Sequence, residues 1–259
     1  MKMISKEEVA AYKRGDSYQS LRKLRNEGMK ALQSYYEKYK EKEAYFKEET
    51  ERKITHERYS QGGMELPRGI LTECHLERLL IGNISRGKFV KKRTNPGFVY
   101  GYDEEGRLVA CDRLEGELEG REYIFCETPL IQVGLRYNLL GLEELMEVKY
   151  NEQGRLERYV YGSVLEGKVD NIRLEQYIYE ANQASAMLLE GGVCHWLWQK
   201  NKEAHDFLMD LAGDYTDNVT GMHVTLYMDE KRRVTSYTWY DDQRPEELLN
   251  SVPKFKLVL

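Results

Sequence analysis

A ten-residue phrase recurs three times in this chain of 259 residues and constrains its fold more than any other feature. The copies read YDEEGRLVAC from Tyr102, YNEQGRLERY from Tyr150 and MDEKRRVTSY from Met228. Each copy joins two strand-like runs, and its Asp or Asn begins a four-residue connection that is typical of a hairpin. The phrase therefore predicts an antiparallel sheet built from repeated hairpins.

Glycine closes the first two connections, at Gly106 and Gly154, where the hairpin needs a positive φ. Arg232 takes the same place in the third copy, so we expect its loop to be strained or differently shaped. A second pair of segments is also similar, namely LEGELEGREYIF at 114–125 and LEGKVDNIRLEQYIY at 165–179. This similarity extends the repeat by a turn and a return strand. The pattern indicates one twisted antiparallel meander of roughly seven or more strands.

The first sixty residues have the period of a helix. Apolar or small residues recur there at three- and four-residue steps as a narrow stripe, namely Leu21, Leu24, Gly28, Leu32, Tyr35, Tyr39 and Phe46. A helix with one docked face explains this stripe, and a coiled-coil dimer is the alternative, although tyrosine and Gly28 suit its seam poorly. We therefore expect an α+β fold with a long N-terminal helical arm, 1–62, and an antiparallel β-rich body, 63–259, that contains one or two short helices.

Two segments fit a helix and a strand equally well. Residues 70–94 contain an apolar run and a basic cluster, and such a cluster suits either a solvated sheet edge or an anionic-ligand site. Residues 193–198, VCHWLW, either join a helix that the pattern predicts at 202–211 or form a strand. Both segments stay open at this stage.

Charge is divided unevenly between the two parts of the chain. Residues 1–97 carry 22 Lys and Arg against 14 Asp and Glu, and residues 98–259 carry 17 against 30, so the net charges are +8 and −13. An acidic body repels nucleic acid and attracts basic proteins. We therefore expect a protein partner and no nucleic acid.

The sequence also bears on the compartment. No apolar run approaches the roughly 20 residues that span a bilayer, and the N-terminus MKMISKEEVAAYKRGD lacks the apolar core of a signal peptide. The four cysteines lie far apart without CxxC spacing, which is typical of free thiols in a reducing environment: Cys74, Cys111, Cys126 and Cys194. These features predict a cytoplasmic protein without membrane contact.

No reaction is indicated by the residue pattern. Cys74-His75 and Cys194-His195 suggest zinc, but adjacent side chains point apart, so each pair lends at most one ligand. The five histidines are scattered and accompany no nucleophile elbow, and the sequence has no phosphate-binding glycine loop. We therefore expect no catalytic residue, no metal site, no cofactor and no enzymatic activity.

Two groups of side chains are the candidates for partner binding. The first is an acidic face at four-residue steps, in which Asp206 and Asp210 share one side of the expected helix and Asp214 lies past its end. Its carboxylates would engage the Lys and Arg of a basic partner. The second is a set of aromatic side chains that pair up on strand faces, namely Tyr159, Tyr161, Tyr237 and Trp239. Such rings either fill the core or form a recognition patch of the kind that is enriched at interfaces.

The phrases YDEEGRL and YNEQGRL resemble the YD repeat of RHS-type proteins, in which a tyrosine, an Asp or Asn turn and Gly-Arg-Leu recur along a β-shell. In that family many copies enclose a toxin, whereas three copies enclose nothing. In general character the chain is more similar to the small immunity proteins encoded beside such toxins. The resemblance covers about thirty residues and implies a β-meander and a toxin as partner.

These observations lead to a functional hypothesis. We expect a protein-binding module, most concretely an immunity protein that neutralises a basic toxin by occlusion. The alternative is a structural scaffold protein that forms a homo-oligomer through its N-terminal helix, and an enzyme of unknown type stands third.

Overall fold

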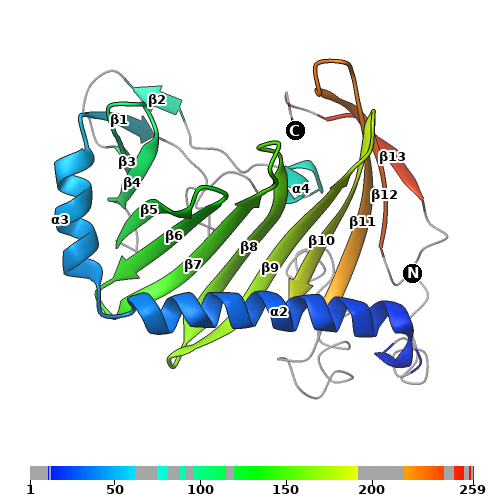
Figure 1. The fold of residues 1–259 in the computed structure, drawn as a ribbon, viewed down its shortest axis with the longest axis horizontal. Coiled ribbons are helices and arrows are strands. Elements are labelled where there is room, and N and C mark those ends of the chain that lie inside the picture. The colour runs from blue at the N-terminus through cyan, green and yellow to red at the C-terminus, as the bar shows by residue number, and fades with distance from the viewer. Residues whose placement is uncertain are drawn as a thin grey trace. The chain divides into compact units, whose positions relative to one another are not determined.

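The computed structural model describes residues 11, 13–61, 75–80, 88–90, 96–114, 120–191, 219–241, 248–253, 257 and 259. This part of the chain consists mostly of antiparallel β-strands, thirteen in all, with an N-terminal helix and few further helices (Figure 1). The predicted antiparallel β-meander with an N-terminal helix is confirmed at this level. The segments 193–198 and 202–211, which were open or helical in the prediction, lie outside the described residues.

The described residues belong to two compact units. Unit 1 comprises 1–30, 75–81 and 170–259, and unit 2 comprises 31–74 and 82–169. The boundary between these units does not coincide with the predicted boundary at residue 62. The division into a helical arm, 1–62, and a β-rich body, 63–259, stays a prediction.

Unit 2 contains eight strands among its described residues, ordered β8-β7-β6-β5-β4-β3-β1-β2. Their bounds are β1 His56–Gln61, β2 Lys88–Val90, β3 Phe98–Tyr102, β4 Leu108–Arg113, β5 Gly120–Thr128, β6 Ile131–Asn138, β7 Gly141–Tyr150 and β8 Leu156–Leu165. Unit 1 holds most of β9 Lys168–Tyr179, followed by β10 Gln183–Gly191, β11 Val219–Met228, β12 Val234–Asp241 and β13 Leu249–Ser251. Within each unit, neighbouring strands pair antiparallel.

The N-terminal helix is shorter than the sequence predicts. Helix α2 spans Asp16–Tyr39, α3 spans Glu43–Lys53, and His56–Gln61 is strand β1. The expectation of helix as far as residue 62 is therefore wrong for residues 56–61. Those residues pair with both β2 and β3, and interstrand hydrogen bonds outweigh the weak helical preference of a polar segment.

The apolar stripe of α2 packs within unit 1 against a glycine of the sheet. A Cβ atom on Gly221 would lie 2.9 Å from Cδ1 and Cδ2 of Leu21, so the absence of a side chain on β11 lets the helix approach. Leu21 retains only 2% of its accessible surface. The close approach explains why this part of α2 docks on the strands.

In unit 2 the stripe continues through aromatic rings. Tyr39 lies edge-on to Phe46 and to Phe125, with ring centroids 5.4 Å apart in both pairs, and Phe46 stacks on Phe125 at 4.9 Å. The hydroxyl of Tyr137 donates to the carbonyl oxygen of Tyr39 at 2.6 Å. This contact marks the face of β6 that carries Tyr137 as the face covered by the helix.

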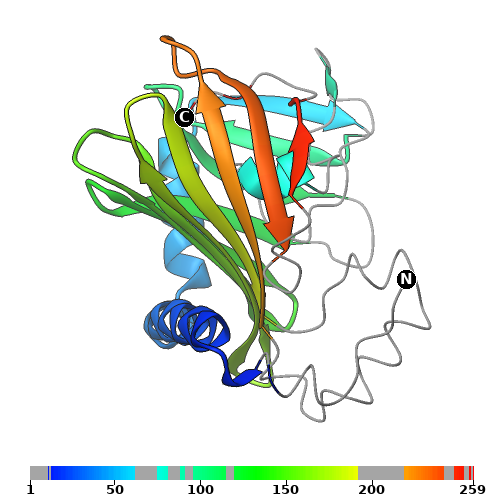
Figure 2. The ribbon, with the colours of Figure 1, turned by 90° about the vertical axis from the view of Figure 1, so that its right-hand side faces the viewer.

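The ambiguous region 70–94 contains both kinds of element. His75–Leu80 forms the short helix α4 in unit 1, and Lys88–Val90 forms β2 in unit 2. Figures 1 and 2 place α4 and the first part of α2 on opposite faces of the unit 1 strands. Among the described residues, no helix is long and apolar enough to cross a membrane.

Candidate functional site

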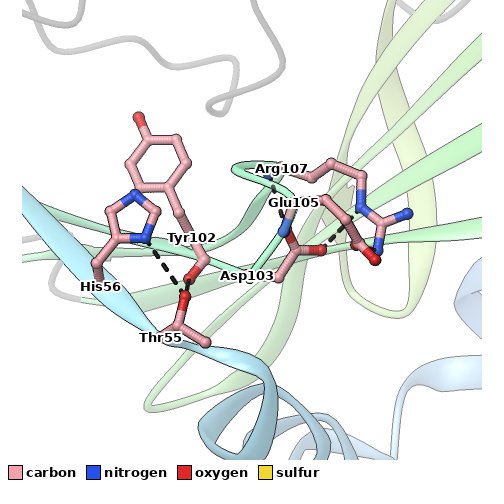
Figure 3. Close-up of polar contacts among 6 residues, drawn as sticks. All are labelled: Thr55, His56, Tyr102, Asp103, Glu105 and Arg107. Atoms are coloured by element: carbon pink, nitrogen blue, oxygen red, sulfur yellow. Dashed lines mark hydrogen bonds and ion pairs between the residues drawn. The ribbon is translucent and has the colours of Figure 1, made fainter.

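The side chain of Asp103 organises the connection between β3 and β4 (Figure 3). Its Oδ1 accepts hydrogen bonds from the backbone N–H of Glu105 at 3.1 Å and of Arg107 at 2.8 Å, and its Oδ2 accepts one from Nε of Arg107 at 2.8 Å. Burial would raise the pKa of the Asp103 carboxyl, but the hydrogen bonds from Arg107 outweigh it and lower that pKa. The carboxylate is thereby fixed as an acceptor within its own turn.

The other two copies of the phrase make the same turn. Oδ1 of Asn151 accepts from the backbone N–H of Gln153 and of Arg155, both at 3.0 Å. Oδ1 of Asp229 accepts from the backbone N–H groups two and four residues on, both at 2.9 Å, and its Oδ2 accepts from Nε of Arg233 at 2.6 Å. All three first residues also donate their own N–H to the carbonyl four residues on. The phrase thus specifies the shape of a turn.

The glycine position of the turn adopts a positive φ in all three copies. Gly106 has φ 75°, Gly154 has φ 70° and Arg232 has φ 55°. Of the two outcomes expected for Arg232, the structure has the strained one, because the third loop keeps the shape of the others and forces a side chain into the left-handed region.

A neighbouring contact lies on β1 beside the Asp103 turn. The His56 ring stacks on Tyr102 with centroids 5.1 Å apart, and the Thr55 hydroxyl donates to the Tyr102 carbonyl at 3.3 Å (Figure 3). These groups attach the start of β1 to the end of β3. The Thr55 hydroxyl also lies 3.4 Å from Nδ1 of His56, and no third group that would orient this imidazole is drawn beside them in Figure 3.

A ladder of buried charges crosses unit 2 on the face opposite the helix. Glu122, Arg136 and Glu144 stand directly across from one another on β5, β6 and β7, and each is at most 5% exposed. Nη1 of Arg136 lies 2.8 Å from Oε2 of Glu144, and the hydroxyl of Tyr161 donates to Oε1 of Glu144 at 3.1 Å. Burial raises the pKa of the Glu144 carboxyl, while Arg136 opposes the rise. Because a one-residue slip would move these charges to the helix face, the ladder specifies the strand register.

Unit 1 holds a second buried polar cluster, where α4 meets β9. The carboxylate of Glu175 accepts from the backbone N–H of Leu76 at 3.0 Å and of Glu77 at 2.9 Å, and from the hydroxyl of Tyr177. Arg173 forms an ion pair with Glu77 beside it. Burial raises the pKa of Glu175 to about 8, against the lowering effect of these donors. A perturbed carboxyl of this kind is a candidate acid or base, but here its two backbone donors belong to α4 and fix the carboxylate in the docking of that helix.

One surface feature of unit 2 consists of large apolar side chains that are exposed. We call it the leucine edge, and it consists of four exposed leucines of unit 2: Leu114, Leu139, Leu140 and Leu165. Leu139 and Leu140 are 100% and 96% exposed, at the connection between β6 and β7. Sequence reasoning missed them, and the signal was available as two leucines between paired strands, where turn residues are expected.

The aromatic residues that the sequence proposed for partner binding are mostly buried and do not form a surface patch. Tyr159, Tyr161 and Tyr237 are 1%, 5% and 7% exposed, so their rings belong to the interior of their units. Trp239 on β12 is half-buried. The three aspartates of the acidic face, Asp206, Asp210 and Asp214, lie outside the described residues.

Metal binding has no support among the residues that the structure describes, since no group of three or more His, Cys, Asp or Glu is arranged to hold an ion there. Of the two Cys-His dipeptides, only His75 is described, at the start of α4. No protein-family model, no curated protein and no solved structure matches this chain. The site must therefore be interpreted from its own geometry.

Proposed function

We propose that the chain is a protein-binding module, most concretely an immunity protein that neutralises a basic toxin by occluding its active site. The observation that carries the proposal is that several cations of the described strands and turns are held in ion pairs with carboxylates of the same chain. These pairs include Arg121 with Asp112, Arg136 with Glu144, Arg158 with Glu147, Lys149 with Glu157, Arg173 with Glu77 and Arg233 with Asp229.

A pair within residues 98–259 removes one charge of each sign and leaves the excess of acidic residues unchanged, whereas the pair of Arg173 with Glu77 removes a cation of this part and adds to the excess. Residues 98–259 contain 30 Asp and Glu against 17 Lys and Arg, and the unpaired excess needs water or a cationic partner. A basic protein is the partner that gains from this field, because complementary charge speeds encounter. Occlusion of an active site then requires only tight binding and no chemistry.

The rival proposal is a scaffold that oligomerises through its N-terminal helix. The apolar side chains of α2 and α3 are buried inside their own units, with Leu21, Leu32 and Phe46 at 2%, 0% and 6% exposure. A coiled-coil seam would have to pull these side chains off the strands. The binding module is therefore better supported.

The repeated turns also have a role in the proposal, as the frame that holds the strands. We take the three Asp or Asn connections as copies of one YD-like hairpin, since they share the same hydrogen bonds, and we take α2 and α3 as the helical arm. In this view the hairpins act as a stiff frame, and the binding side chains lie elsewhere on the strands and loops.

The test begins with capture. The tagged full chain is mixed with secreted fractions of the same and related strains, and recovery of one basic protein in equal amount supports the proposal. Association of that protein is then timed in low and high salt for wild type and for the variant Asp206→Lys/Asp210→Lys. We expect at least a tenfold slower association for the variant in low salt and little difference in high salt, where charges are screened.

The matched control is Glu41→Lys/Glu48→Lys, which changes the net charge equally but in the basic N-terminal part. Equal slowing by both variants would show that only total charge matters and would reject steering by the acidic face. Failure of the captured protein to lose its toxicity on binding would reject neutralisation.

A further inference from the structure

We propose that unit 1 carries a groove for a short amphipathic helix of a partner protein, and that α4 is the resident occupant that blocks this groove. The inference goes beyond the proposed function and does not depend on it. The residues that form the groove come from β9, β10 and β12, and all of them belong to unit 1.

The strands of unit 1 hold α4 by the two ends of its backbone. At the start of the helix, the carboxyl oxygens of Glu175 accept the N–H groups of Leu76 at 3.0 Å and of Glu77 at 2.9 Å. Near its end, the hydroxyl of Tyr237 donates to the carbonyl oxygen of Leu79 at 3.1 Å. The first four N–H groups and the last four carbonyls of a helix have no partner inside it, so these contacts recognise a short helix through its backbone.

Side chains of α4 add sequence specificity to this backbone recognition. Leu76 and Leu79 lie about one turn apart and are both buried, and the helix lies closest to β10. Glu77 is buried as well, and it forms an ion pair with Arg173 of β9. The groove therefore selects a helix with leucine at its first and fourth positions and an acidic residue at its second.

The buried polar groups of this site suit recognition better than packing. Glu175 is 1% exposed, and a buried carboxyl needs hydrogen bonds to offset its loss of water. Two of its donors are N–H groups of α4, so Glu175 loses both when the helix departs. Apolar side chains would attach a structural helix at lower cost, whereas charged groups at fixed positions discriminate between occupants.

The place of α4 in the sequence is also that of a ligand. Residues 75–81 of unit 1 come from between two segments of unit 2, 31–74 and 82–169, so α4 has no sequence neighbour within its own unit. A helix of six residues is unstable alone in water, because it forms too few hydrogen bonds to offset nucleation. Unit 1 thus orders a separate short segment, as a receptor orders a helical peptide that folds on binding.

The chemistry of the groove defines the class of its occupant. The start of a helix offers adjacent free N–H groups to Glu175, and its last turn offers a free carbonyl to Tyr237. The phosphates of a nucleic acid or a lipid bring only further acceptor oxygens to Glu175. An extended peptide places residues three apart on opposite faces, so it cannot present both leucines together. A helix with the pattern Leu-Glu-x-Leu meets every requirement.

Fluorescence anisotropy of a labelled peptide that copies residues 72–82 tests the proposal on the full chain under reducing conditions. In wild type, α4 competes at an effective concentration on the order of millimolar. Leu76→Asp/Leu79→Asp places two charges beneath α4 and vacates the groove, so we expect this variant to bind the peptide at least tenfold more tightly than wild type. The matched control Leu248→Asp/Val252→Asp adds the same charges at exposed positions of unit 1 and should bind as wild type does.

A charge reversal gives a second readout, which general loosening of the fold would not produce. A peptide with Glu77→Arg should bind the vacated variant at least tenfold more weakly than the original peptide. Adding Arg173→Glu to the protein should reverse the order of the two peptides. If the vacated variant loses its β-sheet circular dichroism, the full chain with Glu77→Arg takes its place, because this change loosens α4 and leaves the leucines intact.

Three outcomes overturn the proposal. The first is a folded, vacated chain that does not bind the peptide, and the second is equal binding of the peptide and its Leu76→Asp form. The third is a wild-type dimer in sedimentation velocity that dissociates in the vacated variant, which would assign the groove to α4 of a second copy. Each measurement uses the synthetic peptide or the chain alone, so its result is separate from the capture of a toxin.

Discussion

Arg232 occupies in the third turn the position that Gly154 occupies in the second, and both have a positive φ, 55° and 70°. The hydrogen bonds made by the backbone N–H groups are the same in the two turns. The turn thus holds Arg232 in a conformation that arginine rarely adopts. The cost of this conformation can be measured as a change in the free energy of unfolding.

We predict that Arg232→Gly stabilises the protein. Relief of the left-handed strain gains about 1–2 kcal/mol, and the greater freedom of glycine in the unfolded chain returns about half of it. The free energy of unfolding in urea should therefore rise by about 0.5–1 kcal/mol. The reverse change, Gly154→Arg, should lower it by a similar amount, and equal stability of all three proteins would contradict the assignment of strain.

The Asp103 turn should depend on its acceptor more than on its charge. Asp103→Ala removes the acceptor for two backbone N–H groups and should cost about 2 kcal/mol. Asp103→Asn keeps an oxygen for those groups, as Asn151 does in its own turn, and should cost less than about 1 kcal/mol. Thermal unfolding of both variants checks the order, with exposed Glu104→Ala as the neutral control.

Glu175 should make the stability fall as the solution becomes alkaline. Its pKa is raised to about 8 in the folded protein, above its value in the unfolded chain, so its contribution is present at low pH and is lost as the pH rises through 8. Linkage gives a loss on the order of 2 kcal/mol between pH 6 and pH 9.

The variant Glu175→Gln isolates this effect, because a neutral amide cannot lose a proton. Its urea midpoint should change less between pH 6 and pH 9 than that of wild type, whereas exposed Glu166→Gln should follow wild type. If Glu175→Gln retains the full alkaline loss, another group is responsible for it.

Within the ladder of unit 2, the ion pair of Arg136 with Glu144 should behave as a buried ion pair. Arg136→Met leaves Glu144 without its cation and should destabilise by about 3–5 kcal/mol. Arg136→Met/Glu144→Leu removes both charges and should recover part of that loss. The half-exposed pair Lys149 and Glu157 is the control, and its single variants should each cost less than about 1 kcal/mol.

The predictable part of this protein is local in the sequence. The turns at Asp103, Asn151 and Asp229 depend on hydrogen bonds to groups two and four residues away, so a ten-residue phrase contains all their partners. The docked stripe of α2 is equally local, because helical period alone assigns its apolar face. Comparison of the three short copies predicted either strain or a different loop shape at Arg232, and the structure has the strained one.

The tertiary structure decided everything that needs a distant partner. Glu175 meets the backbone of Leu76 across 99 residues, and no pattern within either segment indicates that contact. Strand β1 exists because β2 and β3 offer hydrogen bonds to a polar segment. Tyr161 is buried and Leu139 is fully exposed, because burial depends on what covers a side chain, and that is a property of the fold rather than of the residue.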